Sequence, residues 1–463
     1  MIRSVPIQAN PLVRLFGDRE YYSILVRIAL PIALQNFITS SLNMVSVVFI
    51  GQMGEESVAA VGLANQAFFL LQLALFGVFS GSAIFTAQLW GKRNIPGIRK
   101  VLGLSLALGL IFGFLFFLTA LFFPRQFLGI YSQDAQVISL GAGYLRVFGP
   151  AYLFVTVTFC YATVLRSTGQ VRLPVLVSIC ALILNTGMNY VFIFGLFGLP
   201  RMGVQGAAVA GLIARVFECT ALVLFVYLLK SPIAASLSEM FSFDWMFIRK
   251  ILKSTLPVAA QEIAWSLGIT TYNMIYARIG TEAIAAMNIV GTIDQMGMVA
   301  VFAMGNACAV MVGNLIGADD IDKAYRYAGW TLRLVMAVGF AAGMGILALS
   351  PLVLNFYKVS PQVIQYARTV LSILAFIVWM RAANTNLIVG ILRSGGDTRF
   401  SFFLETCTMW CIGVPLAWIG AFVFGLPVYW VYLLAMTDEA TKFVIASWRY
   451  SSRRWIHNLA ATV

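Results

Sequence analysis

Two acidic residues that interrupt long apolar stretches are the clearest candidates for chemistry in this sequence. Glu262 and Asp294 each stand among aliphatic, aromatic and small residues. A charged side chain at the centre of a membrane-spanning helix costs about 2.5–3.5 kcal/mol on insertion scales, so it usually faces a cavity or a partner. A carboxyl group held there can exchange a proton, or bind Na⁺ together with carbonyl and amide oxygens. We therefore predict Glu262 and Asp294 as residues that couple to a cation, either H⁺ or Na⁺.

Glu262 begins a polar stripe along its predicted helix. With about 100° of turn per residue, Glu262, Ser266, Thr270 and Asn273 fall within an arc of about 80°. Such a stripe suits a water-filled cavity. Apart from Na⁺ at Glu262, the sequence indicates no metal site.

Both acids also allow a structural interpretation. Glu262 could form an interhelical hydrogen bond, or a salt bridge with Arg381, and have no other role. Asp294 could lie nearer the outer surface instead of lining a cavity. The sequence leaves these alternatives open.

Amide and hydroxyl side chains also occur at intervals within the apolar stretches. They can bind a ligand, or they can hold helices together with about 0.6–2 kcal/mol each. The predicted lining of a substrate cavity consists of Asn36, Ser40, Asn43, Asn185, Asn189, Ser266, Thr270, Asn273 and Arg381.

Groups suited to enzymatic catalysis are scarce. His457 is the single histidine and lies in a basic C-terminal segment, while all six cysteines lie within apolar stretches. No nucleophile–base pair or metal-ligating cluster is evident. Residues 395–398, Gly-Gly-Asp-Thr, lack the Lys-Ser/Thr of a phosphate-binding loop. We expect no enzymatic activity, no cofactor beyond a coupling ion, and no disulfide framework.

The composition of the chain indicates that membrane-spanning helices position these residues. The chain has 463 residues, of which 60% are hydrophobic and 11% charged. A soluble domain has roughly 25% charged residues, so most of this surface must face lipid. Runs of about 20 apolar residues, the length of a membrane-spanning helix, occur at about 24–50, 58–90, 101–123, 146–165, 173–195, 204–229, 255–277, 284–316, 329–351, 368–392, 400–424 and 428–449.

The net charge of +13 reflects membrane topology. If the first span starts in the cytoplasm, most Lys and Arg residues fall on the cytoplasmic side, which is the usual asymmetry of inner-membrane proteins. Nucleic acid is therefore not an expected partner, and both termini are predicted to be cytoplasmic. The basic residues expected outside are Arg125, Arg146, Arg201, Arg278, Lys358 and Arg368.

The two halves of the sequence resemble each other at a constant spacing. Pro31 matches Pro257 and Gln35 matches Gln261, and the register continues as far as the pair Gln136 and Gln362. Each half contains an even number of spans, so both enter the membrane from the same side and are related by a pseudo-two-fold axis along the membrane normal.

We therefore predict an all-α polytopic membrane protein of about twelve transmembrane helices, arranged as two six-helix bundles. The predicted boundaries are 1–229 for the N-terminal lobe, 230–254 for a cytoplasmic linker and 255–463 for the C-terminal lobe. A period-two alternation of apolar residues is absent, which argues against a transmembrane barrel.

Several motifs in this order resemble the multidrug and toxic compound extrusion (MATE) family. They are Leu30-Pro31, residues 51–54 (Gly-Gln-Met-Gly), residues 184–195 with Asn185 and Asn189, residues 203–208, and residues 391–398. The resemblance covers nearly the whole chain. It implies a secondary-active antiporter that exports amphipathic, often cationic, compounds by alternating access, driven by inward H⁺ or Na⁺.

The chain departs from the acidic positions that this resemblance implies. Where archaeal-type members carry an acid on the first helix, this chain has Ser46, and their fifth-helix acid falls at Asn189. The helix-7 glutamate of sodium-type and eukaryotic members falls at Trp265, and their helix-10 aspartate falls near Ala382. The usual cation sites of the family therefore do not transfer to this chain.

Two alternatives to a cation-coupled exporter stay open. One is a flippase for a lipid-linked sugar, which would need a strongly basic cavity to hold a diphosphate. Only Arg215 and Arg381 are expected within spans, which argues against it. The other is a membrane scaffold without transport. We expect a monomer in the inner (plasma) membrane, with a small molecule and the lipid bilayer as its partners.

Overall fold

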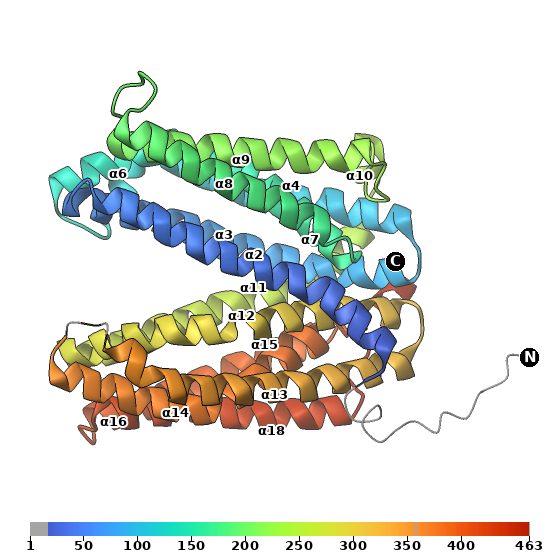
Figure 1. Ribbon diagram of the computed structural model, residues 1–463. Coiled ribbons are helices and arrows are strands. Elements are labelled where there is room, and N and C mark those ends of the chain that lie inside the picture. The colour runs from blue at the N-terminus through green and yellow to red at the C-terminus, as the bar shows by residue number, and fades with distance from the viewer. Residues whose placement is uncertain (1–16, 356, 358, 463) are drawn as a thin grey trace, which may run out of the picture. The chain divides into compact units, whose positions relative to one another are not determined.

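The computed structural model describes residues 17–355, 357 and 359–462, without the side chains of Asn43, Val47 and Thr462. The described residues form helices joined by short turns (Figure 1). They are α2 (Arg19–Gly51), α3 (Glu55–Gly91), α4 (Ile95–Phe122), α5 (Pro124–Gly129), α6 (Ala135–Phe148), α7 (Ala151–Ser167), α8 (Arg172–Phe194), α9 (Gly203–Leu228), α10 (Leu237–Met240), α11 (Trp245–Ile279), α12 (Thr281–Gly317), α13 (Ile321–Leu354), α14 (Pro361–Thr385), η1 (Asn386–Arg393), α15 (Thr398–Thr408), η2 (Met409–Gly413), α16 (Val414–Phe422), α17 (Val428–Ala435), α18 (Thr437–Ser451) and η3 (Leu459–Thr462).

The all-α prediction is confirmed, whereas the count of twelve spans is not. In the part of the chain that the structure describes, nine helices are long and apolar enough to cross a membrane, or ten if α6 and α7 form one span bent by 53°. The bend falls at Gly149 and Pro150, because proline has no N–H to continue the helical hydrogen bonds. The expected last span, 428–449, is interrupted at Met436 between α17 and α18.

The described residues divide into two compact units. The N-terminal unit is Leu34–Glu262, and the C-terminal unit consists of residues 17–33 and Ile263–Thr462. The divisions fall inside α2 and α11, so each of these helices gives one part to each unit. The predicted boundaries were at 229 and 255, whereas the two units divide after residues 33 and 262. Residues 255–262 therefore belong to the N-terminal unit.

The two divided helices each contain a proline close to the division. Pro31 lies inside α2 and Pro257 lies inside α11. A proline within a helix removes one backbone hydrogen bond and bends the chain. Pro31 and Pro257 are matched positions of the sequence repeat, so each half has one proline inside its divided helix.

Specific packing fixes the first part of each divided helix in its unit. Tyr21 on α2 is fully buried in the C-terminal unit, where its hydroxyl hydrogen-bonds Oγ1 of Thr331 at 3.0 Å. In the N-terminal unit, a Cβ added to Gly81 on α3 would lie 2.6 Å from Cα of Thr255 on α11. Glycine is therefore required at this contact between α3 and α11.

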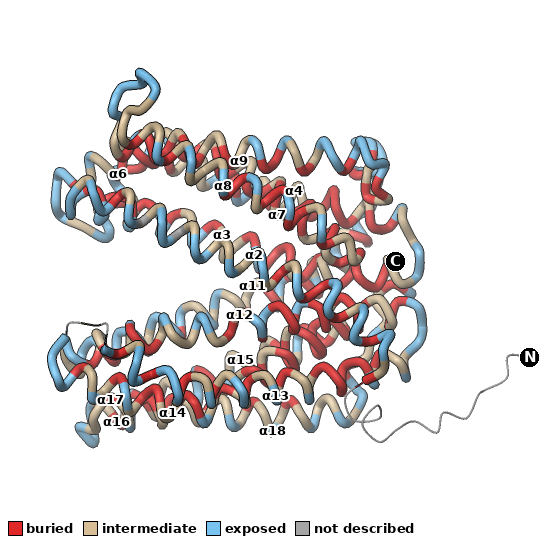
Figure 2. Tube along the Cα trace, in the orientation of Figure 1, coloured by how far each residue is buried: buried red, intermediate tan, exposed pale blue. Residues whose placement is uncertain are grey.

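The N-terminal unit is a bundle in which α3 packs on α4, α4 on α7, and α8 on α9. Figure 2 shows buried residues concentrated on the sides of the helices that face their neighbours within the bundle. Asp134 caps the N-terminus of α6 through hydrogen bonds from the N–H groups of Gln136 and Val137. This bundle provides the walls of the site described below.

The predicted linker between the halves is partly helical. It contains α10, and α11 begins inside it at Trp245. Glu239 of α10 forms an ion pair of 2.5 Å with Arg99 of α4. The carbonyl oxygen of Met240 lies so close to Gly103 of α4 that a Cβ there would overlap it. The segment is thereby docked on the N-terminal unit.

The C-terminal unit contains two π-helical segments, η1 and η2. Such wider turns are rare and often occur at functional sites. Beyond α18, Trp455 is fully buried in an apolar cluster with Leu387, Ile391 and Leu404. The backbone N–H of His457 donates to the carbonyl oxygen of Gly395 at 2.7 Å. The chain after α18 is thus anchored to the unit.

Candidate functional site

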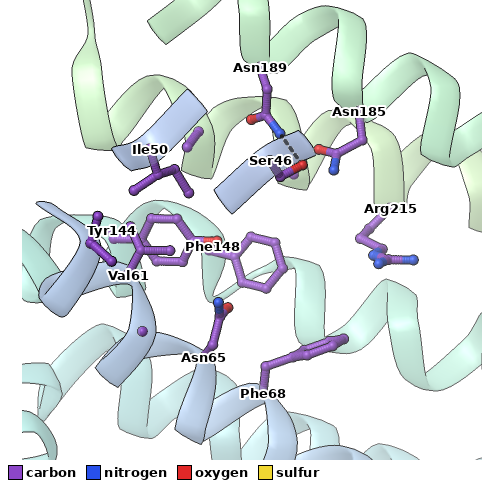
Figure 3. Close-up of a pocket in the computed structure, with 14 residues that line it drawn as sticks. Ser46, Ile50, Val61, Asn65, Phe68, Tyr144, Phe148, Asn185, Asn189 and Arg215 are labelled. Atoms are coloured by element: carbon purple, nitrogen blue, oxygen red, sulfur yellow. Dashed lines mark hydrogen bonds between the residues drawn. The ribbon is translucent and has the colours of Figure 1, made fainter. Parts of the chain in front are cut away.

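A cavity of about 400 Å³ lies within the N-terminal unit. Its volume is in the range of small-molecule sites in proteins, about 300–1,000 Å³. Helices α2, α3, α6, α8 and α9 provide its walls (Figure 3). The lining residues are Ser46, Ile50, Val58, Val61, Gly62, Asn65, Phe68, Tyr144, Phe148, Asn185, Asn189, Ala207, Gly211 and Arg215.

Amide and hydroxyl groups form the polar part of this cavity between α2 and α8. Asn189 donates from Nδ2 to Oγ of Ser46 at 3.4 Å, and Ser46 in turn donates to the carbonyl oxygen of Leu42 at 3.1 Å. The Oδ1 atoms of Asn185 and Asn189 are buried and have no hydrogen-bond partner among the described residues. A buried acceptor without a partner is costly, so these two oxygens are positioned to receive a donor from a ligand or water.

An arginine supplies the charge of the cavity lining. Nη1 of Arg215 forms an ion pair of 2.6 Å with Glu218, one helical turn further along α9. Glu218 is buried, and it also accepts a hydrogen bond of 2.6 Å from Oγ of Ser178 on α8. The side chain of Arg215 is 30% exposed but that of Glu218 only 6%. The guanidinium group, not the carboxylate, therefore faces the cavity.

Aromatic side chains surround the polar groups. The ring of Phe148 lies edge-on to Phe68, with centroids 6.0 Å apart, and stacks on Tyr144 at 5.6 Å. The guanidinium carbon of Arg215 lies 5.9 Å from the centroid of Phe68, within the range of a cation–π contact. Figure 3 shows Asn189 and Ser46 at the top of the cavity, Phe68 at the bottom and Arg215 to the right.

The C-terminal unit contains an ion pair between α12 and α14. Nη1 of Arg381 donates to Oδ1 of Asp294 at 2.8 Å. The side chains of Arg381 and Asp294 are 24% and 18% exposed, so the pair is largely withdrawn from the surface. A charge in this position is neutralised by its partner.

A second charged cluster of this unit lies on α18. The Nζ of Lys442 is 3.0 Å from Oδ2 of Asp438 and 3.3 Å from Oε1 of Glu439. Asn384 on α14 donates from Nδ2 to Oε2 of Glu439 at 2.7 Å. Asp438 and Lys442 are almost fully buried. Two carboxylates thus share one ammonium group inside the unit.

The acidic, histidine and cysteine side chains of the described residues are not grouped as metal ligands. Within the described ranges, no group of three or more His, Cys, Asp or Glu side chains is placed to hold a metal ion. The cavity of the N-terminal unit is lined by neutral polar groups, aromatic rings and a guanidinium group. This lining suits reversible binding of an organic molecule.

The repeat that is visible in the sequence also appears in the comparison with protein families. The MatE family model matches twice, over residues 31–191 and 257–419. The two matches begin at Pro31 and Pro257, the first matched pair of the repeat. They cover more than half of the chain. The chain belongs to the MATE family of transporters.

Bacterial relatives of this MATE protein align over most of its length. It is 28% identical to the probable multidrug resistance protein NorM of Agrobacterium fabrum, over 86% of this chain and 87% of that protein. It is 24% identical to the probable multidrug resistance protein NorM of Thermotoga maritima, over 89% of this chain and 88% of that protein. The comparisons thus support a multidrug efflux transporter.

Solved MATE structures have the same fold. A crystal structure of MATE in complex with MaL6 is 20% identical, covers 96% of this chain and all of its own, and superposes with a TM-score of 0.82. A MOP superfamily transporter of Pyrococcus furiosus is 21% identical, with 96% and 99% coverage and a TM-score of 0.83. The prediction of an all-α polytopic membrane protein of the MATE type is confirmed.

The structure brings some of the predicted cavity residues of this MATE protein together. Asn185 and Asn189 line the cavity of the N-terminal unit. Asn36 and Ser40 lie on α2 of the same unit but not in that lining, and the side chain of Asn43 is outside the described residues. Among the described side chains of α2, Ser46 is the polar one that lines this cavity.

The stripe predicted on α11 crosses the division between the units. Glu262 is half-buried, engaged with neighbouring groups, and the last α11 residue of the N-terminal unit. Ser266, Thr270 and Asn273 belong to the C-terminal unit. Thr270 and Asn273 are exposed, and the hydroxyl of Thr270 donates to the carbonyl oxygen of Ser266 at 2.9 Å. Their proposed role in a cavity stays a prediction.

Sequence reasoning did not find the cationic side of the cavity. It placed Arg215 within a span but did not assign it to a cavity, and it omitted Ser46, Asn65 and the aromatic wall. The signal available was the spacing of Arg215 and Glu218, which predicts an ion pair. Spacing along one helix does not tell which member of the pair faces a ligand.

Proposed function

We propose that this MATE protein is a cation-coupled antiporter that exports amphipathic small molecules, and that the cavity of the N-terminal unit is its substrate-binding compartment. The observation that carries the proposal is the lining of this cavity, where amides, aromatic rings and a guanidinium group surround about 400 Å³. Such a mixture holds molecules that are partly apolar and partly polar. Parallel sequence repeats also suit alternating access, in which two lobes rock about a binding site.

Coupling requires an ionisable group whose protonation or ion binding differs between states. Glu262 and Asp294 are the proposed groups, for H⁺ or Na⁺. Asp294 is paired with Arg381, so ion binding there would have to compete with a guanidinium group. Glu262 lies on α11 close to Pro257, where the helix passes from one unit to the other. This position favours Glu262 as the residue that links an ion to a rearrangement.

We also propose that the protein works as a monomer in the plasma membrane. The asymmetry of basic residues supports insertion into the plasma membrane with both termini in the cytoplasm. A substrate compartment formed by one unit of one chain supports a monomer as the working form. The substrates that the family resemblance implies are cationic, with no cofactor beyond the coupling ion.

A flippase for a lipid-linked sugar fits this cavity less well. A diphosphate usually needs several arginine or lysine side chains. Among the described residues of the lining, Arg215 carries a positive charge, and Glu218 already pairs with it. An exporter of small molecules is therefore the better assignment.

Reconstituted vesicles provide the test. The purified protein is placed in liposomes with an imposed pH or Na⁺ gradient, and movement of the cationic dye ethidium is followed by fluorescence. We expect gradient-dependent movement with the wild type and none with Glu262→Gln, although the variant keeps its thermal stability. Movement that is independent of both gradients would contradict coupling. Exposed Arg249→Gln, on the first turns of α11, is the matched control.

A further inference from the structure

We propose that the cavity of the N-terminal unit selects aromatic zwitterions, in which a carboxylate binds Arg215 and an ammonium group binds the amide oxygens of Asn185 and Asn189. This inference rests on the proposed function, because it names the substrate class of the same cavity. It differs from the cationic class that the family resemblance implies.

The accessible member of the ion pair on α9 is the cation. The carboxylate of Glu218 is occupied by Nη1 of Arg215 and by the hydroxyl of Ser178, both at 2.6 Å. A guanidinium group has five N–H donors, and the bond to Glu218 uses one of them. Donors therefore remain on the cavity side of Arg215. A ligand carboxylate fits them because carboxylates bind guanidinium groups with two parallel hydrogen bonds.

A second arginine of the same unit, Arg166, adds a positive charge outside the lining. Arg166 on α7 interacts electrostatically with Glu218, and its Nη2 donates to Oε1 of Gln35 at 3.2 Å. The Nε of Arg166 is buried without a hydrogen-bond partner in the described structure. Glu218 thus interacts electrostatically with both guanidinium groups but forms its ion pair with Arg215. An additional anionic group on a ligand is favoured in the cavity, so a ligand that carries only positive charge binds less tightly than a zwitterion.

The amide oxygens provide the complementary subsite. Asn189 is 4% exposed and uses its Nδ2 for Ser46, so its Oδ1 remains as an acceptor. Oδ1 of Asn185, one turn earlier on α8, is likewise buried and unpaired in the described part of the chain. Oxygens of this kind accept hydrogen bonds from an ammonium group. Because none of the described lining residues is acidic, the ammonium group is held by dipoles and not by a counter-charge.

The aromatic side chains of the cavity lining favour an aromatic ligand. Phe68, Tyr144 and Phe148 form one continuous wall through ring contacts of 5.6–6.0 Å. Aromatic rings pack on such a wall in stacked or edge-on arrangements. Gly62 on α3 also lines the cavity, and a Cβ added there would meet nothing within 4 Å. The wall therefore has room for a ring system beside it.

Three dansyl compounds test the charge preference on one fluorophore. Nε-dansyl-lysine carries an ammonium and a carboxylate, dansylcadaverine lacks the carboxylate, and 6-(dansylamino)hexanoate lacks the ammonium. Affinities are measured by fluorescence titration of the purified protein in lipid nanodiscs without any gradient. We expect the wild type to bind the zwitterion about tenfold or more tightly than either other probe, as for loss of one charge-assisted hydrogen bond. Equal binding of the cation and the zwitterion would overturn the proposal.

Paired substitutions assign each end of the ligand. Arg215→Gln with Glu218→Gln removes the charge without leaving a buried carboxylate unpaired, and Ser178 can still donate to the new amide. This variant should bind the zwitterion and the anion about tenfold more weakly and leave the cation unchanged. Asn185→Leu with Asn189→Leu should weaken binding of the zwitterion and the cation but not of the anion. An unchanged ranking of the probes in both variants would overturn the assignment.

Two further variants keep the experiment interpretable. Arg215→Lys retains the charge but not the planar fork, so it should lose part of the preference for the zwitterion even if the double variant does not fold. Arg99→Gln removes a positive charge of the same unit that pairs with Glu239 away from the cavity, and should bind all three probes as the wild type does. A change of ranking in Arg99→Gln would attribute the preference to net charge and overturn the assignment to Arg215.

Failure of this inference can be told apart from failure of the proposed function. The binding measurements use no gradient, and transport of the same probes is followed separately in liposomes. Zwitterion preference without gradient-driven movement would contradict the antiporter and leave the ligand class standing. Gradient-driven movement without a preference for the zwitterion would contradict the ligand class and leave the antiporter standing.

Discussion

Asn189 on α8 donates a hydrogen bond of 3.4 Å to the hydroxyl of Ser46 on α2, across the cavity wall of the N-terminal unit. These are the two positions at which the resemblance to archaeal-type MATE members implies acids. In this chain they are neutral and hydrogen-bonded to each other. The charge that lines the cavity comes instead from Arg215 on α9. The polarity of this cavity thus differs from the one that the resemblance implies.

Restoring an acid at one of these positions should change the ligand preference. Asn189→Asp places a carboxylate in the lining, so we expect dansylcadaverine to bind about tenfold more tightly and 6-(dansylamino)hexanoate more weakly. Fluorescence titration in nanodiscs measures both. Ser46→Ala, which removes the hydrogen bond without adding charge, is the control. An Asn189→Asp protein with the wild-type ranking would show that position 189 does not contact the ligand.

The glycine of η2 is required by the packing around the buried acids of α18. A Cβ on Gly413 would overlap the hydroxyl of Tyr272 and lie 3.1 Å from Cβ of Asp438. We expect Gly413→Ala to lower the free energy of unfolding by about 1–3 kcal/mol, as overpacking does. Thermal unfolding in detergent measures this. Gly187→Ala, where a Cβ meets nothing within 4 Å, should be neutral or slightly stabilising, and equal effects at both sites would contradict the explanation.

Lys442 neutralises two carboxylates inside the C-terminal unit. Lys442→Met leaves Asp438 and Glu439 without their ammonium partner, and we expect a loss of about 3–5 kcal/mol in the free energy of unfolding. Chemical denaturation measures this loss. The neutral triple variant, which adds Asp438→Asn and Glu439→Gln, should recover most of it. Exposed Lys253→Met is the control, and a Lys442→Met protein as stable as this control would contradict the ion cluster.

The docking of α10 should depend on pH through Glu239. The backbone N–H of Ser236 and the guanidinium of Arg99 hold the pKa of Glu239 below its ordinary value. A lowered carboxyl pKa means that the stabilisation is present above the ordinary value and is lost as the pH falls through the folded value. Hydrogen exchange of residues 230–244 should therefore speed up at acidic pH, relative to intrinsic rates, in the wild type. It should lose that dependence in Glu239→Gln, and an unchanged dependence would exclude Glu239 as its source.

The parts of the fold that follow from apolar runs and from the internal repeat were predictable from the sequence. Apolar runs predicted the helices, and the matched pair Pro31 and Pro257 predicted a repeat that the family matches also follow. The division inside α2 and α11 was missed, because apolarity does not show which neighbours the two parts of a bent helix contact. The interruption at Met436 was also missed, because residues 428–449 were predicted as one span although Thr437, Asp438 and Glu439 follow Met436 directly.

The candidate site was predictable only in part. Buried amides within spans indicated Asn185 and Asn189, since polar groups in a membrane need partners. The side of the Arg215–Glu218 pair that faces the cavity was not predictable. It depends on Ser178, which lies on the neighbouring helix α8 and holds the carboxylate away from the cavity. Contacts between helices of this kind are not encoded in the spacing along one helix.

Filling the cavity tests most directly whether it is the substrate compartment of a gradient-driven exporter. Gly62 lines the cavity and a Cβ there meets nothing within 4 Å, so Gly62→Phe should occupy the space without disturbing the fold. Gly187→Phe, equally unobstructed and outside the lining, is the matched control. In liposomes with an imposed ion gradient, we predict that Gly62→Phe abolishes movement of Nε-dansyl-lysine and ethidium while Gly187→Phe transports both. Transport at the wild-type rate by a folded Gly62→Phe protein would contradict the account.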